Sequence, residues 1–434
     1  MTTSKKKEIK VVELFAGVGG FRVGFERASK NFNTVWFNQW EPGKKIQHAH
    51  DVYEYIWSKS GLMNTNTDLE KVVTEHIEDV PQHDLLVGGF PCQDYSVAKS
   101  LSKSKGLIGK KGVLWWSIVS ILKQFEDTTG KKKPRMLLLE NVDRLLKSPS
   151  NQRGRDFAVM LKSLDELGYD VEWRVVDSSK YGFPQRRKRV FIFATLRTDS
   201  ISEDYKNLSA IERLEKGIFG KSLPALFSKD AVVSFPLSKT LQEISNTFGK
   251  GTSTSPFLKA GVSIKGFVYT VDSKEKEQKE YKTLGDILLD EKSVEKTFGT
   301  GFRIDKEEEE KWEYQKGAKK IERVNKANGQ TYTFSEGSMT YPDALDRASR
   351  TIVTGEGGSS ASRFKHVIKP KGKRYLRRLT PIELERLNGF DDSHTKTGIE
   401  GEISDNQRAF FMGNALVTGV VEKIGKEIAK RYEG

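Results

Sequence analysis

The sequence predicts an α/β protein whose core is a mostly parallel β-sheet covered by helices. Four short apolar segments indicate buried strands, at residues 10–15, 84–87, 136–139 and 189–194. Segments with helical spacing of apolar residues separate them, and this alternation is typical of a parallel sheet. The first strand runs directly into the glycine-rich turn AGVGG, a common feature at the ligand-binding edge of α/β folds.

Helices are indicated between these strands by apolar residues three and four positions apart. FRVGFERAS follows the glycine turn, WWSIVSILKQF precedes the third strand and FAVMLKSLDELG precedes the fourth. Beyond about residue 198 the alternation fades into short pieces such as GFVYTVD and QTYTFSEG. We therefore predict a first domain at 1–198, a smaller mixed domain at 199–375 and a segment, 376–434, that returns to the first domain.

The C-terminal segment carries clear helix signals. Thr380, Pro381 and Glu383 offer an N-cap, a proline in the first turn and a capping box, and Gly389 is placed to end that helix. The last stretch, FFMGNALVTGVVEKIGKEIAKRY, is predicted to be one amphipathic helix entered through Gly413 and Asn414.

Composition limits the possible partners and ligands. The formal net charge of +14 favours a polyanionic partner, although an ordinary basic protein has the same balance. One cysteine excludes an intramolecular disulfide, and six histidines without ligand spacing give no reason to expect a metal. No apolar run approaches the ~18 residues of a membrane span, and the N-terminus lacks a signal-peptide core, so we expect a cytoplasmic protein.

Chemically active side chains gather where the predicted strands end. In an open parallel sheet, ligands bind beyond the carboxyl ends of the strands. The residues there are Phe15 to Gly20 after the first strand, Pro91-Cys92-Gln93 after the second, Glu140 after the third and Gln185 to Arg189 before the fourth. We therefore predict one site that holds a thiol, a carboxylate and arginines beside a glycine turn.

Each of these features also has an ordinary structural interpretation. The glycines can form a tight turn without a ligand, a lone cysteine is often an inert small apolar residue, and clustered arginines can lie on a solvated face. The dinucleotide fingerprint GxGxxG, started at Gly17, requires glycine at position 22 but finds Arg22. A smaller adenosyl ligand is therefore favoured over a nicotinamide or flavin dinucleotide.

The combined pattern resembles the DNA (cytosine-5) methyltransferases of bacterial restriction–modification systems. VELFAGVGG is similar to the first cofactor motif of that family, GGFPCQDYS to its nucleophile loop, LLLENV to its glutamate motif and YGFPQRRKRVFIFA to its arginine motif. KGVLWWSIVSIL, RLTPIELERLNGF and FFMGNALV correspond to further motifs, in the order of the family. The resemblance implies a Rossmann-like domain that binds S-adenosylmethionine, with a mostly parallel sheet, and a smaller target recognition domain.

The resemblance also implies catalytic roles for four residues. Cys92 would add to cytosine C6, which breaks the aromatic conjugation and makes C5 able to attack a methyl group. Glu140 would hold a proton at cytosine N3, and Arg187 and Arg189 would hold the cytosine carbonyl, Glu140 and the adjoining phosphate. The expected product of the cofactor is S-adenosylhomocysteine.

Cofactor contacts are implied for residues around the glycine turn and in later motifs. Most family members have an acid before the tryptophan that packs on adenine, whereas this chain has Gln39, with Glu41 just after Trp40. Either residue could therefore bind the ribose. The full implied set is Phe15, Gly17, Gly19, Gly20, Gln39, Trp40, Asp68, Leu114 and Asn414.

DNA contacts are implied for two segments. Residues 99–112 contain five lysines and no acid, and they resemble a loop that closes over a flipped base. The segment SRTIVTGEGGSSASRFKH ends the domain expected to read the DNA sequence. The implied contacts are Ser96, Lys103, Lys105, Lys110, Thr351, Ile352, Gly357 and Gly358.

Two alternatives have the same fold: a transfer-RNA cytosine methyltransferase, and a DNA-binding regulator that has lost its activity. The length of the 199–375 domain favours DNA over transfer RNA, and the complete set of Cys92, Glu140, Arg187 and Arg189 favours an active enzyme. Double-stranded DNA is the expected partner of a monomeric enzyme. A restriction endonuclease acting on the same site is a further expected partner.

Overall fold

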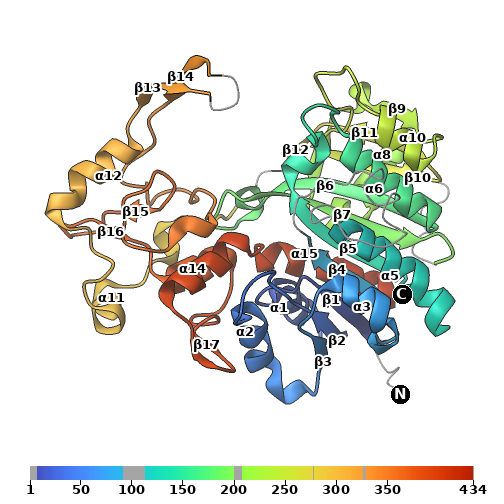
Figure 1. Cartoon of the computed structure of the whole chain (residues 1–434), viewed down its shortest axis with the longest axis horizontal. Coiled ribbons are helices and arrows are strands. Elements are labelled where there is room, and N and C mark those ends of the chain that lie inside the picture. Colours follow the sequence, from blue (N-terminus) through green and yellow to red (C-terminus); the bar gives the residue numbers. More distant parts are fainter. Residues whose placement is uncertain (1–6, 91–112, 200–207, 277, 326–328, 434) are drawn as a thin grey trace.

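The computed structural model describes residues 7–90, 113–199, 208–276, 278–325 and 329–433. Its main feature is a ten-stranded sheet with the order β3-β2-β1-β4-β5-β7-β6-β10-β11-β9 (Figure 1). The first five strands are β1 (Ile9–Leu14), β2 (Phe32–Asn38), β3 (Met63–Thr65), β4 (Leu85–Gly89) and β5 (Met136–Val142). They pair in parallel and form the predicted parallel core.

The other half of the sheet is antiparallel, which the sequence reasoning did not anticipate. β7 (Lys188–Leu196) runs antiparallel to β5 and to β6 (Tyr169–Asp177). Residues 189–194, expected as a further parallel strand, therefore run in the opposite direction. Because β7 is reversed, the arginine motif that precedes it lies at the same edge as the carboxyl ends of β4 and β5.

Helices cover both faces of the sheet. On one face α3 (Leu69–Glu75), α5 (Val113–Thr129) and α6 (Arg155–Glu166) pack on alternate residues of the strands, including Val12 and Leu14. On the other face α1 (Gly20–Ala28), α9 (Ile218–Ser222) and α15 (Thr418–Glu433) pack on the intervening residues, including Ile9 and Val11. The helices predicted after the glycine turn and before the third and fourth predicted strands are thus confirmed as α1, α5 and α6.

The sheet extends into the stretch expected to form the second domain. β9 (Val233–Pro236), β10 (Ala260–Ile264) and β11 (Phe267–Val271) continue it beyond β6, and α8 (Ala210–Lys216) and α10 (Leu241–Thr247) pack beside them. β8 (Ala225–Phe227) pairs with β12 (Ser273–Glu275) as a separate two-stranded sheet. The sheet-bearing lobe therefore reaches to about residue 280, well past the boundary predicted at residue 199.

The second body in Figure 1 is smaller, and we call residues 284–378 the small lobe. It contains α11 (Glu291–Phe298), α12 (Glu309–Lys316) and the hairpin of β13 (Lys319–Val324) and β14 (Thr331–Glu336). β15 (Val367–Ile368) pairs with β16 (Arg377–Arg378) near its centre. α2 (His48–Trp57) lies in the sheet-bearing lobe and packs against the short pair β17 (Thr397–Gly398) and β18 (Gly401–Glu402).

The C-terminal segment confirms one prediction and corrects another. α13 (Pro381–Asn388) begins with the expected Thr380–Glu383 capping box and ends at Gly389, whose φ is 78°. The single final helix was wrong: α14 (Asp405–Asn414) ends at the Gly413-Asn414 pair, and α15 begins only at Thr418. Gly413 lies against backbone, since a Cβ there would be 2.4 Å from the nitrogen of Thr354.

A buried ion pair at the start of α13 gives the first testable prediction. Arg377 donates to both oxygens of Glu383, at 2.7 and 2.8 Å, and both side chains are fully buried. Glu383→Ala should lower the free energy of unfolding by about 3–5 kcal/mol, because it removes one of the two carboxylates that pair with the buried Arg377 guanidinium and leaves the Thr380 and Leu289 amides without their acceptor. The second carboxylate, Glu291, lies 2.9 Å from the same guanidinium. Denaturant unfolding measures this loss.

The matched control is Glu295→Ala, which breaks the partly exposed pair with Arg303. That change should lower the free energy of unfolding by less than ~1 kcal/mol, because exposed ion pairs contribute little to stability. Equal losses in the two variants would contradict the role given to burial.

Within the described ranges, no helix combines the length and the apolar character that crossing a bilayer requires.

Candidate active site

The glycine turn opens the site at the carboxyl end of β1. Phe15 and Gly17 have positive φ angles of 54° and 56°, so the chain turns sharply before α1. A Cβ on Gly17 would meet no atom within 4 Å, so this position faces open space. Gly19 is the opposite case, since a Cβ there would lie 2.3 Å from the Trp57 ring. The turn therefore rests on α2 and leaves its Gly17 side accessible to a ligand.

Residues from the neighbouring strands complete the wall around this turn. Oε1 of Gln39, directly after β2, accepts a hydrogen bond of 2.7 Å from the Gly17 amide, and its side chain is buried. Trp40 is 36% exposed, which leaves its indole available for stacking. Asp68 caps α3 through Oδ1, which accepts from the Glu70 amide at 3.0 Å. One oxygen of that carboxylate is thus already used by the helix.

The remaining expected cofactor residues differ in exposure. Gly20 begins α1 and packs on Leu416, which follows Asn414 by two residues. Asn414 is exposed at the end of α14, and Leu114 is half-buried in the first turn of α5. The C-terminal segment thereby lies beside the glycine turn.

A buried polar layer under the turn was not found from the sequence. The Tyr53 hydroxyl donates to Oε2 of Glu13 at 2.9 Å, and burial raises the pKa of Glu13 to about 8. The Arg22 guanidinium lies 4.5 Å from the centre of the Trp57 ring. The signal available was a glutamate inside the apolar run KVVELF, where an unpaired charge is costly. Arg22 therefore braces α1 against α2.

A carboxylate and a guanidinium meet on adjacent strands at the same edge. Arg189 Nε lies 2.8 Å from Glu140 Oε1, and both side chains are largely buried. β5 and β7 align Val142 with Arg189, and β4 and β5 align Gly89 with Glu140. A Cβ at Gly89 would be 3.2 Å from Glu140 Oε2, so glycine leaves room for that carboxylate.

The predicted nucleophile lies outside the described residues, as do Ser96, Lys103, Lys105 and Lys110. The described chain reaches Phe90, two residues before Cys92. Phe90 is buried, and its carbonyl accepts a hydrogen bond of 2.8 Å from Asn141 Nδ2. Asn141 directly follows Glu140, so the start of the nucleophile loop is attached to the strand that carries the carboxylate.

Arg187 takes a different position from Arg189. Its Nη1 donates to the Ile352 carbonyl at 3.2 Å and its Nη2 donates to the Gly413 carbonyl at 2.9 Å. Burial and the nearby Arg189 lower the pKa of Arg187 to about 9. Within the described part of the chain its Nε has no hydrogen-bond acceptor. Arg187 thus joins the arginine motif to the small lobe and to the end of α14, while Arg189 pairs with Glu140.

The expected DNA-contacting segment pairs with the arginine motif. Thr351 Oγ1 donates to the Arg186 carbonyl at 2.6 Å, and the Ile352 amide donates to Gln185 Oε1 at 3.0 Å. Ile352 is only 1% exposed, so its side chain belongs to the core between the lobes. Gln185, whose amide also donates to Asn388 Oδ1 at 2.8 Å, is a buried junction that the sequence reasoning missed.

Gly357 and Gly358 pack on α14 and are half-buried. A Cβ on Gly357 would lie 3.0 Å from the Asn406 Cα, and the Gly358 amide donates to Asn406 Oδ1 at 2.6 Å. These contacts explain the glycines by packing within the protein. At Gly355, in the same segment, a Cβ would have no atom within 4 Å.

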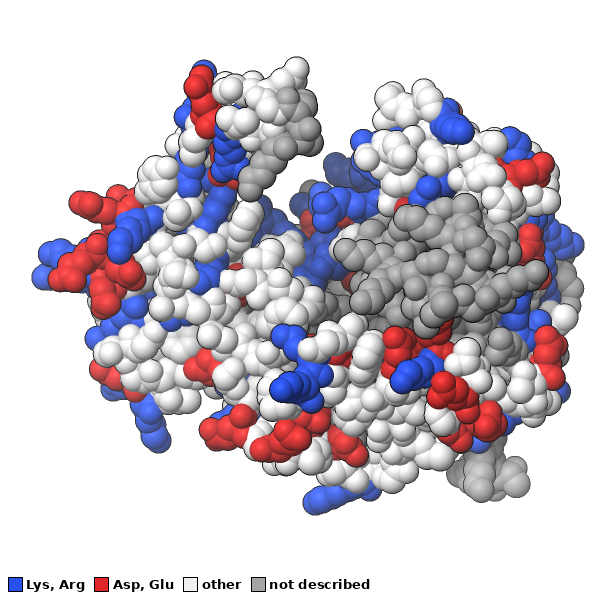
Figure 2. Space-filling view, viewed as in Figure 1, with Lys and Arg blue, Asp and Glu red and all other residues white. Residues whose placement is uncertain are grey.

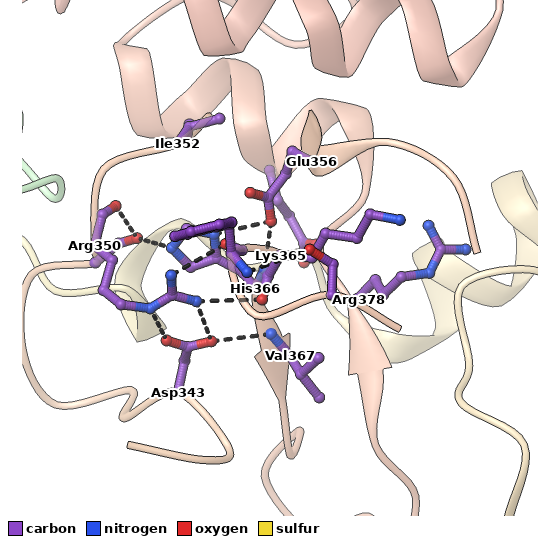
Figure 3. A network of polar contacts seen from close by, with 12 residues as sticks. Asp343, Arg350, Ile352, Glu356, Lys365, His366, Val367 and Arg378 are labelled. Carbon is purple, nitrogen blue, oxygen red and sulfur yellow. Dashed lines mark hydrogen bonds and ion pairs between the residues drawn. The ribbon is translucent and has the colours of Figure 1, made fainter. Parts of the chain in front are cut away.

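A network of buried polar groups fixes this segment in the small lobe (Figure 3). His366 Nε2 lies 2.8 Å from Ser349 Oγ, and His366 Nδ1 lies 2.9 Å from Glu356 Oε1. Arg350 donates to both oxygens of Asp343, at 2.7 and 3.0 Å. Ser349 in turn accepts from the Arg186 amide through its carbonyl, at 2.8 Å. The network is a rigid connection between the small lobe and the arginine motif.

A glycine turn after the first strand of a parallel α/β core, with a carboxylate–arginine pair at the same edge of the sheet, fits the class of α/β methyltransferases. Comparison with known proteins agrees. Residues 9–430 match the family model of the C-5 cytosine-specific DNA methylases. The chain therefore belongs to the C-5 cytosine-specific DNA methylase family, and it is a DNA (cytosine-5) methyltransferase.

Individual relatives give the same result. The type II methyltransferase M.Sau3AI of Staphylococcus aureus is 43% identical over 428 residues, which cover 98% of this chain and 96% of the relative. M.HaeII of Haemophilus aegyptius is 36% identical over 191 residues, 44% of this chain and 51% of the relative. Among solved structures, the S. pombe Dnmt2 methyltransferase aligns with a TM-score of 0.57 at 14% identity, covering 98% of each chain. This structural similarity shows the fold alone.

Proposed function

We propose that this enzyme transfers a methyl group from S-adenosylmethionine to C5 of a cytosine that is flipped out of a specific duplex DNA site. The observation that supports it best is the Arg189–Glu140 ion pair of 2.8 Å, on strands adjacent to the start of the Cys92 loop. A flipped base is needed because a cytosine within the base stack is inaccessible to such a recessed edge.

In the proposed reaction the Cys92 sulfur forms a bond to cytosine C6, and Glu140 holds a proton at N3 as charge develops on the ring. Electron density then moves to C5, which would take the methyl group as the S–CH3 bond of the cofactor breaks, with S-adenosylhomocysteine as the leaving group. The C5 proton leaves to a base, the S–C6 bond breaks and the thiolate is regenerated. Arg189 contributes by fixing the orientation of Glu140 and by offsetting its charge when the proton is absent.

The residues around the glycine turn fit S-adenosylmethionine, which supplies an electrophilic methyl group. Gly17 faces open space that a Cβ would fill, and the exposed Trp40 offers a surface for the adenine ring. Gln39 fixes the turn with its carbonyl oxygen and keeps its amide N–H groups for a ribose hydroxyl. We therefore assign the ribose contact to Gln39 rather than to Glu41.

This assignment predicts a difference between two variants. Gln39→Ala should raise the Kd of S-adenosylmethionine about tenfold, because losing ~1.4 kcal/mol of hydrogen bonding corresponds to that factor. Glu41→Ala should change it less than about twofold. Isothermal titration of the free enzyme measures both values, and the reverse order would transfer the ribose contact to Glu41.

We place the DNA in the hollow between the two lobes, which Figure 2 shows with Lys and Arg side chains on both of its sides. A net charge of +14 supports a polyanionic substrate. In this proposal the small lobe carries target recognition. The enzyme acts as a monomer in the cytoplasm and is associated with the nucleoid when it is bound to DNA. It belongs to a type II restriction–modification system, in which an endonuclease acts on the same DNA site.

The direct test uses labelled S-adenosylmethionine with duplex DNA and transfer RNA side by side. Transfer to DNA alone is expected, followed by a single methylated motif in bisulfite sequencing of DNA from expressing cells. Transfer to transfer RNA alone would overturn the choice of substrate. DNA binding without any transfer would favour the inactive regulator.

A further inference from the structure

The β13–β14 hairpin projects from the small lobe as an isolated two-stranded ribbon (Figure 1). Nearly all its described side chains are exposed, and no other described strand pairs with it. Isolated hairpins are only marginally stable in water, so a hairpin with one fixed shape requires support at its base or a partner along its strands. This hairpin is supported at its base, and its exposed strands leave surface for a partner.

The two faces of the hairpin differ. The register places Ile321 opposite Phe334 and Arg323 opposite Tyr332 on one face, where the Arg323 guanidinium lies 3.7 Å from the centre of the Phe334 ring. Lys319 on that face donates to Gln315 Oε1 at 2.8 Å. These contacts engage Arg323, Phe334 and Lys319 within the protein, while Ile321 and Tyr332 on the same face remain exposed.

The second face is free, and we call it the reading face. It consists of six exposed side chains: Lys320, Glu322, Val324, Thr331, Thr333 and Ser335. Among the residues that the structure describes, neither Lys320 nor Glu322 makes an ion pair. The face therefore presents unpaired donors, acceptors and one apolar group in a row.

The base of the ribbon is held firmly. Arg363 donates to the carbonyls of Gly317, at 3.2 Å, and of Gly337, which precede and follow the two strands. Its side chain also lies 3.6 Å from Glu336. One guanidinium thus clamps both ends of the hairpin, so that the ribbon keeps one direction relative to the lobe.

The clamp continues to the active site through buried contacts. Lys316 Nζ donates to the Arg363 carbonyl at 2.9 Å and also to the Lys365 carbonyl. Lys365 is followed by His366, whose contact with Ser349 leads to the arginine motif (Figure 3). The ribbon is therefore held in a constant register relative to Glu140 and Arg189. A base reader requires such a register, because the bases it recognises lie at fixed steps from the cytosine that reacts.

We propose that the β13–β14 hairpin enters the major groove of duplex DNA and that its reading face determines the target sequence. The inference rests on the proposed function, since it needs a DNA substrate. The major groove admits a two-stranded ribbon, and its base edges match this chemistry. Lysine donates to guanine, glutamate accepts from cytosine N4, hydroxyl groups bind either kind of edge and an aliphatic group contacts the thymine methyl. The ribbon arm borders the hollow in Figure 2.

The test compares the methylated motif of the wild-type enzyme with that of Lys320→Ala and Glu322→Ala. Each variant should relax the motif at one or more positions and lower kcat/KM on the wild-type site about 5- to 150-fold, the range for a lost base contact. The kcat at saturating DNA should stay within about threefold. Bisulfite sequencing and steady-state kinetics on duplex DNA give these values.

Lys274→Ala on the separate β8–β12 sheet removes the same charge from another exposed strand and should change neither the motif nor kcat/KM. An unchanged motif in both hairpin variants would overturn the inference, as would weaker binding without a change of motif, which indicates phosphate contact only. If the wild-type enzyme methylates no DNA, the proposed function itself fails, and that result is distinct from failure of the hairpin inference.

Discussion

Replacing Glu140 by glutamine is expected to lower kcat about 10²- to 10⁴-fold, the usual contribution of a positioned proton-transfer group. Glutamine has nearly the same shape and can still accept a hydrogen bond from Arg189, which lies 2.8 Å from the carboxylate in the native protein. It cannot carry an exchangeable proton to cytosine N3. Single-turnover methyl transfer at saturating DNA and cofactor measures the loss.

Binding distinguishes a chemical effect from a structural one. Glu140→Gln should keep the Kd values for DNA and S-adenosylmethionine within about threefold, because the amide preserves the packing around Gly89. Glu78→Gln, an exposed carboxylate in the short helix Ile77–Asp79, serves as the control and should retain full activity. If the Glu140→Gln enzyme kept more than about a tenth of the wild-type kcat, Glu140 would not be the proton-transfer group.

The second large effect is expected at Cys92. Cys92→Ala should abolish transfer, by more than about 10⁴-fold, because no other group can form the bond to C6 that activates C5. The thermal midpoint and DNA affinity should be retained. Since Cys92 is the only cysteine in the chain, iodoacetamide should inactivate the wild-type enzyme with the modification of a single residue. Activity that survives complete alkylation would contradict a thiol mechanism.

The parallel core could be predicted because its signals are local. Apolar runs of strand length, the positive φ positions of the glycine turn and the Thr380–Glu383 capping box depend on residues close together in sequence. The direction of a strand, by contrast, does not depend on residues close together in sequence. β6 follows β5 through α6 and runs in the same direction, and the short connection 178–187 then returns the chain into β7 in the opposite direction. β7 is buried on both faces, so its apolar run does not indicate its direction.

The predicted boundary at residue 199 did not anticipate that β9, β10 and β11 extend the sheet. Their sequences are short and alternate with polar residues, which is typical of antiparallel strands at the rim of a sheet. The same pattern occurs in β14, which lies far away on the small lobe. Composition alone cannot tell whether such a strand joins the large sheet or lies in the small lobe.

Some features of the active site could likewise be predicted from the sequence, and others could not. The motif pattern predicts one site that contains Glu140, Arg187 and Arg189, and the structure places Arg189 2.8 Å from Glu140. The pattern does not separate the contacts of Arg189 from those of Arg187. The junction at Gln185 and the Ser349–His366–Glu356 contacts depend on groups up to about 200 residues apart in sequence. No local pattern marks such contacts, so only the folded structure reveals that the small lobe is connected directly to the arginine motif.

The covalent step is tested most directly with duplex DNA that contains 5-fluorocytosine at the target position. Fluorine at C5 cannot leave as a proton does, so the bond between sulfur and C6 should persist after methyl transfer. The expected result with S-adenosylmethionine is a denaturation-resistant complex whose DNA-linked peptide contains Cys92. The same complex in a Cys92→Ala protein, or a link at any other residue, would contradict the account.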